Sequence, residues 1–147
     1  GKVDISIDPE QSSEFTLKLR IPAWADGAKV AVNGTAVDIA ANTDKGYLAI
    51  KRTWAKGDSV TMDLPMQVRR LYAHPKVRMD VGRVALSRGP LVYCVEQTDN
   101  HGALVSELKL TRTAEIHVEA RKDLLGGIKV LTANAIDLTK GDWGGGT

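Results

Sequence analysis

Apolar and polar residues alternate with a period of two along several stretches of the chain. Phe15, Leu17 and Leu19 are separated by single polar residues, and Val60 and Met62 are separated by a threonine. This spacing places the apolar side chains on one face of a β-strand and leaves the other face in water. Strands predicted on this basis cover residues 3–7, 15–21 and 60–64.

A hairpin is predicted where Lys29–Val32 runs into Asn33-Gly34. Both residues tolerate the positive φ that a type I′ turn requires at its two central positions. The returning strand would carry Val37 and Ile39. The same stretch, Asn33-Gly34-Thr35, also matches a glycosylation sequon, but the turn is the better interpretation.

Short strand-like runs continue through most of the remaining sequence, with glycine and proline between them. The further predicted strands are residues 47–52, 67–72, 83–87, 91–96, 115–119 and 128–133. Such spacing is typical of an antiparallel β-sandwich. We therefore predict an all-β, jelly-roll-like sandwich with an incomplete second sheet at its C-terminal end. No segment shows a helical period, and residues 102–110 fit either one short helix or an irregular loop.

The pattern becomes less regular after Asp99. We expect residues 1–98 to form the main sandwich and residues 99–147 to extend it or to begin a second one. The core is expected to include Phe15 and Tyr93, with Trp24 and Trp54 closing corners, and Trp143 is expected to pack on something outside the chain. The residues predicted to be buried are Leu17, Leu19, Val60, Met62, Val92 and Cys94.

Composition and charge exclude several classes of protein. Among 147 residues, 43% are hydrophobic and 26% charged, with a net charge of +2, which is a globular composition without a basic face for nucleic acid. No apolar run approaches the roughly 20 residues that span a membrane. The sequence therefore predicts neither a nucleic-acid nor a membrane partner, and it leaves cytoplasmic and periplasmic locations open.

Cys94, the single cysteine, lies in the apolar run Leu91–Val95 and is followed by Glu96 and Asp99. A thiol and two carboxylates so close together fit a nucleophile with its helpers. They fit equally a buried strand that ends in a polar turn. A reactive thiol needs an electropositive, partly exposed site, and none is evident, so we favour burial for Cys94 and a polar strand end for the carboxylates.

The remaining candidate chemistry is sparse. His74, His101 and His117 share no metal-ligand spacing with one another or with Cys94, so no metal or cofactor site is predicted. A two-carboxylate glycosidase site is not excluded by counting carboxylates. Aromatic residues, which stack on sugars, make up only 5%. We predict no catalytic residue in this chain.

An ordered series of short motifs nevertheless resembles one known family. The motifs are Leu19-Arg20-Ile21-Pro22-Ala23-Trp24-Ala25, Val32-Asn33-Gly34, Gly46-Tyr47, Arg52-x-Trp54-x-x-Gly57-Asp58, Leu64-Pro65-Met66, His74-Pro75, Arg88-Gly89-Pro90-Leu91-Val92-Tyr93-Cys94, Asp99-Asn100 and Leu124-Leu125-Gly126-Gly127. Over roughly residues 15–130 they resemble the C-terminal β-sandwich region of glycoside hydrolase family 127, the β-L-arabinofuranosidase family.

The resemblance implies that catalysis takes place elsewhere in a larger protein. In the family, an upstream (α/α)6 barrel holds a cysteine nucleophile on zinc, and no position here matches that nucleophile or the zinc ligands. The implied role is a non-catalytic accessory domain that braces this barrel. The alternatives are a carbohydrate-binding module and an oligomerisation domain.

Relatives also continue past the Leu124–Gly127 motif into a further strand segment that this sequence lacks. We therefore expect an exposed sheet edge near the C-terminal end, and exposed edges invite pairing with another chain. Self-association through this edge is a further prediction.

Overall fold

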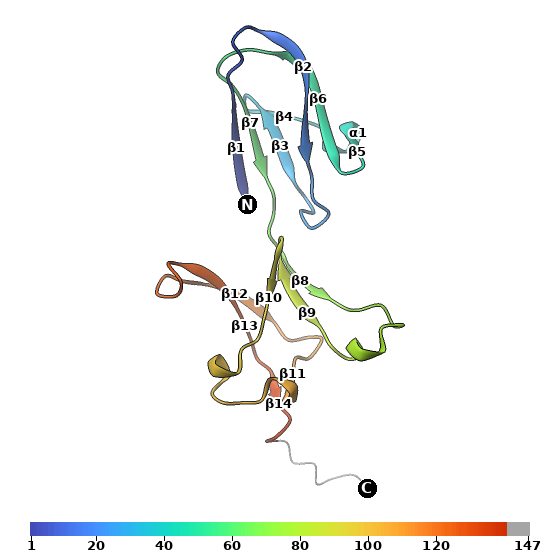
Figure 1. The fold of residues 1–147 in the computed structure, drawn as a ribbon, viewed down its shortest axis with the longest axis vertical. Helices are drawn as coiled ribbons and strands as arrows, with labels where there is room; N and C mark the ends of the chain where they lie inside the picture. The colour runs from blue at the N-terminus through green and yellow to red at the C-terminus, as the bar shows by residue number, and fades with distance from the viewer. Residues whose placement is uncertain (141–147) are drawn as a thin grey trace. The chain divides into compact units, whose positions relative to one another are not determined.

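The computed structural model describes residues 1–140, which divide into two compact units (Figure 1). The first unit comprises Gly1–Arg69 and Arg88–Leu91, and the second comprises Arg70–Ser87 and the chain from Val92 onward. The expectation for Trp143 lies outside the described residues. The division falls near residue 70, whereas the boundary expected at residue 98 lies inside the second unit. The predicted all-β, antiparallel fold class is confirmed.

Two antiparallel sheets form the first unit (Figure 1). One has the strand order β1-β7-β3-β4 and the other the order β2-β6-β5. The bounds are β1 Lys2–Ile7, β2 Ser13–Arg20, β3 Lys29–Val32, β4 Thr35–Ala36, β5 Thr43–Asp44, β6 Tyr47–Trp54 and β7 Asp58–Asp63.

The core of the first unit is built from the inward faces of both sheets. Val32 pairs with Val60 in one sheet, and Leu19 pairs with Leu48 in the other. All four side chains are buried in a single cluster with Trp54. The alternation read from the sequence is thus the alternation of inward and outward faces, and the predicted burial of Leu19, Val60 and Met62 is confirmed; Leu17 is half-buried.

The predicted Asn33-Gly34 turn is confirmed, because both residues have positive φ, 50° and 80°, between β3 and β4. The returning strand is shorter than predicted. It ends at Ala36, and Ile39 begins the one-turn helix α1 (Ile39–Asn42). The reason is Asp38, whose carboxylate caps the helix by accepting from the Ala41 amide, as N-cap residues do.

Short strands and single turns of 3-10 helix make up the rest of the chain. β8 (Val68–Leu71), β9 (Ala85–Arg88) and β10 (Leu91–Tyr93) form one sheet, which the division into units crosses. β12 (Ile116–Arg121) pairs with β13 (Ile128–Ala133), and β11 (Leu108–Lys109) pairs with β14 (Ile136–Asp137). The 3-10 helices are η1 Arg78–Asp80, η2 Gln97–Asn100 and η3 Val105–Glu107.

The second unit has almost no buried interior among its described residues. Its one fully buried residue is Ser87, whereas the buried hydrophobic residues of the chain all belong to the first unit. Hydrogen bonds hold parts of it together instead. The Arg70 guanidinium donates to the carbonyls of Thr111 and Ala114 at 3.0 and 2.5 Å.

The prediction that Val92 and Cys94 are buried is wrong. Val92 is 67% exposed, and the Cys94 thiol is also exposed. The apolar run suggested a strand covered on both faces, but β10 ends at Tyr93 and two of its three residues are exposed. The expectation that Phe15 and Tyr93 belong to the core is also wrong: Phe15 is 37% exposed and Tyr93 only half-buried.

Candidate functional site

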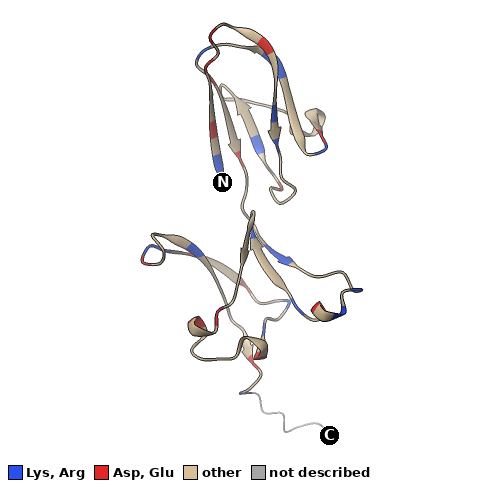
Figure 2. Cartoon of the chain, in the orientation of Figure 1, with Lys and Arg blue, Asp and Glu red and all other residues tan. Residues whose placement is uncertain are grey.

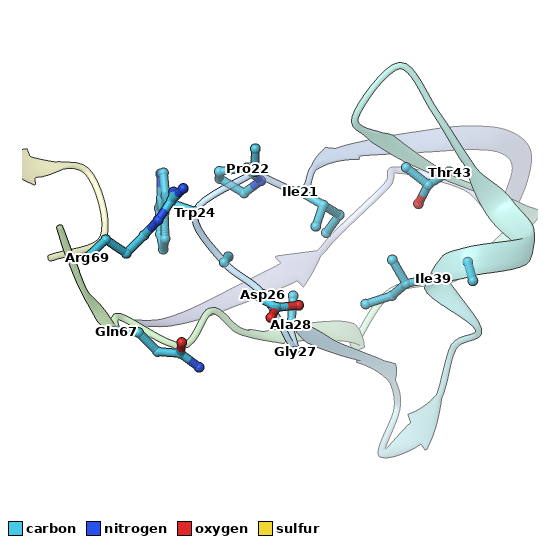
Figure 3. Close-up of a pocket in the computed structure, with 13 residues that line it drawn as sticks. Ile21, Pro22, Trp24, Asp26, Gly27, Ala28, Ile39, Thr43, Gln67 and Arg69 are labelled. Carbon is cyan, nitrogen blue, oxygen red and sulfur yellow. The ribbon is translucent and has the colours of Figure 1, made fainter. Parts of the chain in front are cut away.

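A hollow lies in the first unit, beside Trp24 (Figure 3). We call it the Trp24 hollow; its volume is about 660 Å³. Figure 3 shows Trp24 and Arg69 at one end and Ile39 and Thr43 at the other. The residues that line it are Ile21, Pro22, Ala23, Trp24, Ala25, Asp26, Gly27, Ala28, Ile39, Ala40, Thr43, Gln67 and Arg69.

Two consecutive turns between β2 and β3 shape one wall of this hollow. The Ala25 amide donates to the Pro22 carbonyl, and the Ala28 amide donates to the Ala25 carbonyl. Ala25 is buried in the core, so the middle of the loop is anchored while Trp24 and Asp26 on either side of it face outward. A loop fixed in this way holds its side chains in defined positions without a ligand.

The Trp24 ring lies close to Gly89 in the turn between β9 and β10. A methyl group placed on Gly89 would lie 2.8 Å from the Met66 side chain and 3.5 Å from the Trp24 ring. A side chain there would require Met66 to move, and the positive φ of Gly89, 57°, also favours glycine. The ring is half-buried, so part of its surface remains available in the hollow.

Several polar groups around the hollow have no partner. Among residues 1–140, the side chains of Trp24, Asp26, Gln67 and Arg69 make no hydrogen bond or ion pair. The Thr43 hydroxyl is the sharpest case, because it is buried and lacks a partner within the described chain. A buried hydroxyl without a partner costs about 1–3 kcal/mol of stability.

The sequence-based candidates Cys94, Glu96 and Asp99 form no catalytic cluster. Cys94 follows the last residue of β10 and is exposed. Glu96 precedes η2 and Asp99 lies within it. The backbone carbonyl of Glu96 accepts from the Asp99 amide and from the Asn100 side chain, so this segment is a polar turn, as favoured from the sequence, although it follows an exposed strand.

The three histidines have different local surroundings. His74 receives a hydrogen bond from the Lys76 amide in an exposed turn, His101 has a left-handed backbone after η2, and His117 lies on β12 beside Glu115. Within residues 1–140, no three His, Cys, Asp or Glu side chains are grouped so that they could hold a metal ion.

A second feature is the exposed apolar surface of the second unit. Thirteen of the seventeen exposed large hydrophobic residues in the described chain belong to it. One stretch of this surface runs from residue 72 to residue 83, and we call it the 72–83 segment. It carries Tyr72, Val77, Met79 and Val81, with Met79 82% exposed and Val81 68% exposed. Sequence reasoning missed this surface. Val77, Met79 and Val81 alternate with charged residues as in a strand, but the structure forms only the 3-10 helix η1 there.

No helix in the described part of the chain has the length and apolar character needed to cross a membrane.

The 72–83 segment is basic as well as apolar. It contains three basic residues, Lys76, Arg78 and Arg83, and one acidic residue, Asp80. In Figure 2, blue segments for Lys and Arg are visible on the loop that follows the strand labelled β8 in Figure 1.

Comparison with known proteins identifies the family of the chain. Residues 1–66 match the family described as "Beta-L-arabinofuranosidase, GH127 middle domain", and residues 68–135 match "Glycoside hydrolase family 127 C-terminal domain". A non-reducing end beta-L-arabinofuranosidase from Bifidobacterium longum subsp. longum is 33% identical over 144 residues, covering 92% of this chain and 21% of that protein.

Solved structures agree. A GH127 beta-L-arabinofuranosidase from Geobacillus stearothermophilus T6 has a TM-score of 0.87 at 47% identity, covering 92% of this chain and 21% of that one. Another GH127 beta-arabinofuranosidase has a TM-score of 0.83 at 36% identity, with coverage of 92% and 23%. The chain thus spans about a fifth of the length of these relatives. It belongs to glycoside hydrolase family 127, whose middle and C-terminal domains it contains.

Proposed function

We propose that this chain is a non-catalytic accessory part of a glycoside hydrolase that acts on β-L-arabinofuranosides. In this proposal the second unit packs against the catalytic (α/α)6 barrel of the parent protein and braces it. Family membership supports the parent activity, because relatives with this name carry a matching region as about a fifth of their length. The bracing role is supported by the structure of the second unit.

The observation that carries the proposal is the contrast in burial between the two units. The first unit has its own core of nine buried hydrophobic residues. The second unit has none among its described residues and exposes thirteen large hydrophobic side chains instead. Such an apolar surface is typical of a region that contacts another protein surface. A barrel in the same polypeptide is the partner that family membership makes available.

The 72–83 segment fits this role because its backbone is defined while its apolar side chains are uncovered. The Val77 amide donates to the His74 carbonyl at 2.8 Å, and the Asp80 amide donates to the Val77 carbonyl at 3.1 Å. These bonds present Met79 and Val81 in fixed positions at low entropic cost to binding. The surplus of basic residues favours an acidic surface on the partner.

The site chemistry of the described chain supports a non-catalytic role. The zinc ion that the family resemblance assigns to the barrel finds no ligand set here, since Cys94 is not grouped with other ligating side chains within residues 1–140. We therefore place both the zinc ion and the nucleophile in the barrel and derive no catalytic step from this chain.

Hydrogen–deuterium exchange tests the docking proposal, measured on the 147-residue chain and on the full-length parent. We expect the amides of the 72–83 segment and of residues 92–95 to exchange more slowly in the parent, because packing on the barrel covers them. The amides of β6 and β7 serve as the internal control, since their core is complete in the chain alone.

Two variants of the parent protein sharpen the test. Met79→Asp should lower the thermal midpoint of the barrel, whereas Tyr47→Asp, at an exposed aromatic residue of the first unit, should not. Equal exchange of the 72–83 segment in the chain and in the parent would overturn the docking proposal. So would protection that appears only at high protein concentration, because it would assign the surface to a second copy.

A further inference from the structure

The Trp24 hollow has the composition of a small-ligand site, separate from the proposed docking surface. Its volume of about 660 Å³ lies within the range of roughly 300–1,000 Å³ that is usual for ligand pockets. Its lining combines an aromatic ring and small apolar residues with a few polar side chains. All the lining residues belong to the first unit, which has a complete core.

The charges around the hollow favour neither an anionic nor a cationic ligand. Asp26 and Arg69 are the only ionised side chains that line it, so their formal charges cancel. Neither is used in an ion pair within the described residues. A carboxylate only accepts hydrogen bonds and a guanidinium only donates them. Together they match a ligand whose groups both donate and accept hydrogen bonds. Sugar hydroxyl groups have this property.

We propose that the Trp24 hollow binds a neutral saccharide that contains arabinose. The exposed part of the Trp24 ring stacks on the apolar C–H face of a sugar ring, because an indole offers a rigid apolar body. Asp26 accepts from sugar hydroxyls, and Arg69 and Gln67 donate to them.

The choice of arabinose rests on the proposed function, whereas the preference for a neutral sugar rests on the hollow itself. The hollow would hold part of a substrate or product chain close to the parent enzyme, which raises the effective concentration of cleavable ends. The carbohydrate-binding alternative and the docking role therefore concern different units of the same chain.

NMR titration of the ¹⁵N-labelled 147-residue chain tests this inference. The probes are L-arabinose and an arabinose disaccharide, with galacturonic acid as an anionic sugar and glycerol as a polyol that cannot stack. We expect saturable shifts for residues 21–28 and 67–69 with the two neutral sugars, at a dissociation constant of about 1 mM. Glucose is added as a further neutral sugar. If it binds with equal affinity, the site is a neutral-sugar site without a preference for arabinose.

Variants separate a built site from a general surface effect. Arg69→Ala removes an exposed side chain without touching the core, and it should weaken binding about tenfold, the typical loss for a hydrogen bond to a charged group. Trp24→Ala should abolish binding. Tyr47→Ala removes an exposed aromatic residue outside the hollow and should leave the affinity unchanged.

Thr43→Val is a control at the opposite end of the hollow. It replaces an unpartnered buried hydroxyl by a methyl group of similar shape, so the thermal midpoint should stay equal or rise, and the sugar affinity should stay unchanged because this hydroxyl is buried. The inference is overturned if no sugar gives saturable shifts, if glycerol gives the same shifts, or if Arg69→Ala and Trp24→Ala bind like the unmodified chain. None of these results would bear on the exchange experiment, because that experiment reports on the second unit.

Discussion

At the residue scale, Leu48 and Leu91 are the same amino acid in opposite surroundings. Leu48 is 0% exposed in the core of the first unit, and Leu91 is 53% exposed. We expect Leu48→Ala to lower the free energy of unfolding by about 2–5 kcal/mol, because the lost methyl groups leave a cavity. Leu91→Ala should change it by less than about 0.5 kcal/mol.

Urea denaturation followed by tryptophan fluorescence measures both variants, since Trp54 is buried in the same core. Similar losses for the two variants would contradict the assignment of Leu48 to a core that is complete within the first unit.

Cys94 carries a second prediction at this scale. Because its thiol is exposed, a maleimide reagent should label the native 147-residue chain nearly as fast as the urea-denatured chain. In the full-length parent the same thiol should react more slowly if the second unit is covered by the barrel. Strong protection in the 147-residue chain itself would show that a cover already exists within the chain.

The sequence predicted the surroundings of some residues and missed others for one physical reason. Alternation identified Leu19, Val60 and Met62 because each lies on a strand whose inward face is covered by the opposite sheet of the same unit. Val92 and Cys94 lie in an equally apolar run, but hydrophobicity indicates only that burial of a side chain is favourable. It does not show whether the residues that would bury the side chain belong to the same stretch of chain.

At the element scale, Asp58 ties two turns of the first unit together. Its carboxylate accepts from the Ala55 amide at 2.9 Å and from the Asn33 side chain at 2.7 Å. Asn33 in turn accepts from the Ser59 amide at 2.8 Å. The hydrogen bond from the Ala55 amide, the bond from Asn33 and the nearby Arg52 guanidinium all lower the pKa of Asp58 from 3.8.

A depressed pKa gives this carboxylate a definite pH dependence. The stabilisation is complete above the unfolded-state pKa of 3.8 and is lost as the pH falls through the lower folded-state pKa. We therefore expect Asp58→Asn to lower the thermal midpoint at pH 7, because an amide group places a donor where two donors already point. The difference from the unmodified chain should shrink as the pH falls below about 4.

Thermal unfolding monitored by circular dichroism between pH 7 and pH 2 checks this expectation. Asp4→Asn is the matched control, because Asp4 has no hydrogen bond or ion pair from its side chain in the described residues. A constant difference between Asp58→Asn and the unmodified chain at all pH values would exclude the carboxylate as its source.

Local turn chemistry explains which elements were predictable. Asn33-Gly34 determined its hairpin because few other pairs accept two successive positive φ values. The strand expected to continue to Ile39 ended early because Asp38 offered a helix cap, a short-range alternative that a period-two pattern does not reveal. The Trp24 hollow was not predicted, since it combines a loop, α1, β5 and β8 from distant parts of the sequence.

At the scale of the whole molecule, the two units differ in what stabilises them. The first has two sheets over a buried core, so it should keep its structure in isolation. The second has short strand pairs, the Arg70 hydrogen bonds and uncovered apolar side chains, so it depends on a partner surface. The barrel is our proposed partner in the parent protein, and without it the apolar surface remains available to other copies of the chain.

The isolated 147-residue chain should therefore self-associate through this apolar surface. Its net charge is +2 at pH 7 and its pI is about 8.7, so electrostatic repulsion between copies is weak and falls further toward pH 8.7. Sedimentation velocity should show a larger species whose fraction grows with protein concentration and as the pH approaches 8.7.

The variant Met79→Asp combined with Val81→Asp distinguishes the responsible surface. It places two charges on the 72–83 segment, where burial against another copy would then cost more than it gains, so the larger species should decline. The matched control, Val3→Asp combined with Tyr47→Asp, alters exposed hydrophobic residues of the first unit and should leave the association unchanged.

Two results would contradict self-association through the second unit: dissociation caused by the control variant, or a sharp monomer for the unmodified chain at high concentration. Either result would mean that the apolar surface of the second unit does not drive association by itself. The bracing role would then require specific complementarity to the barrel rather than exposed hydrophobic area alone.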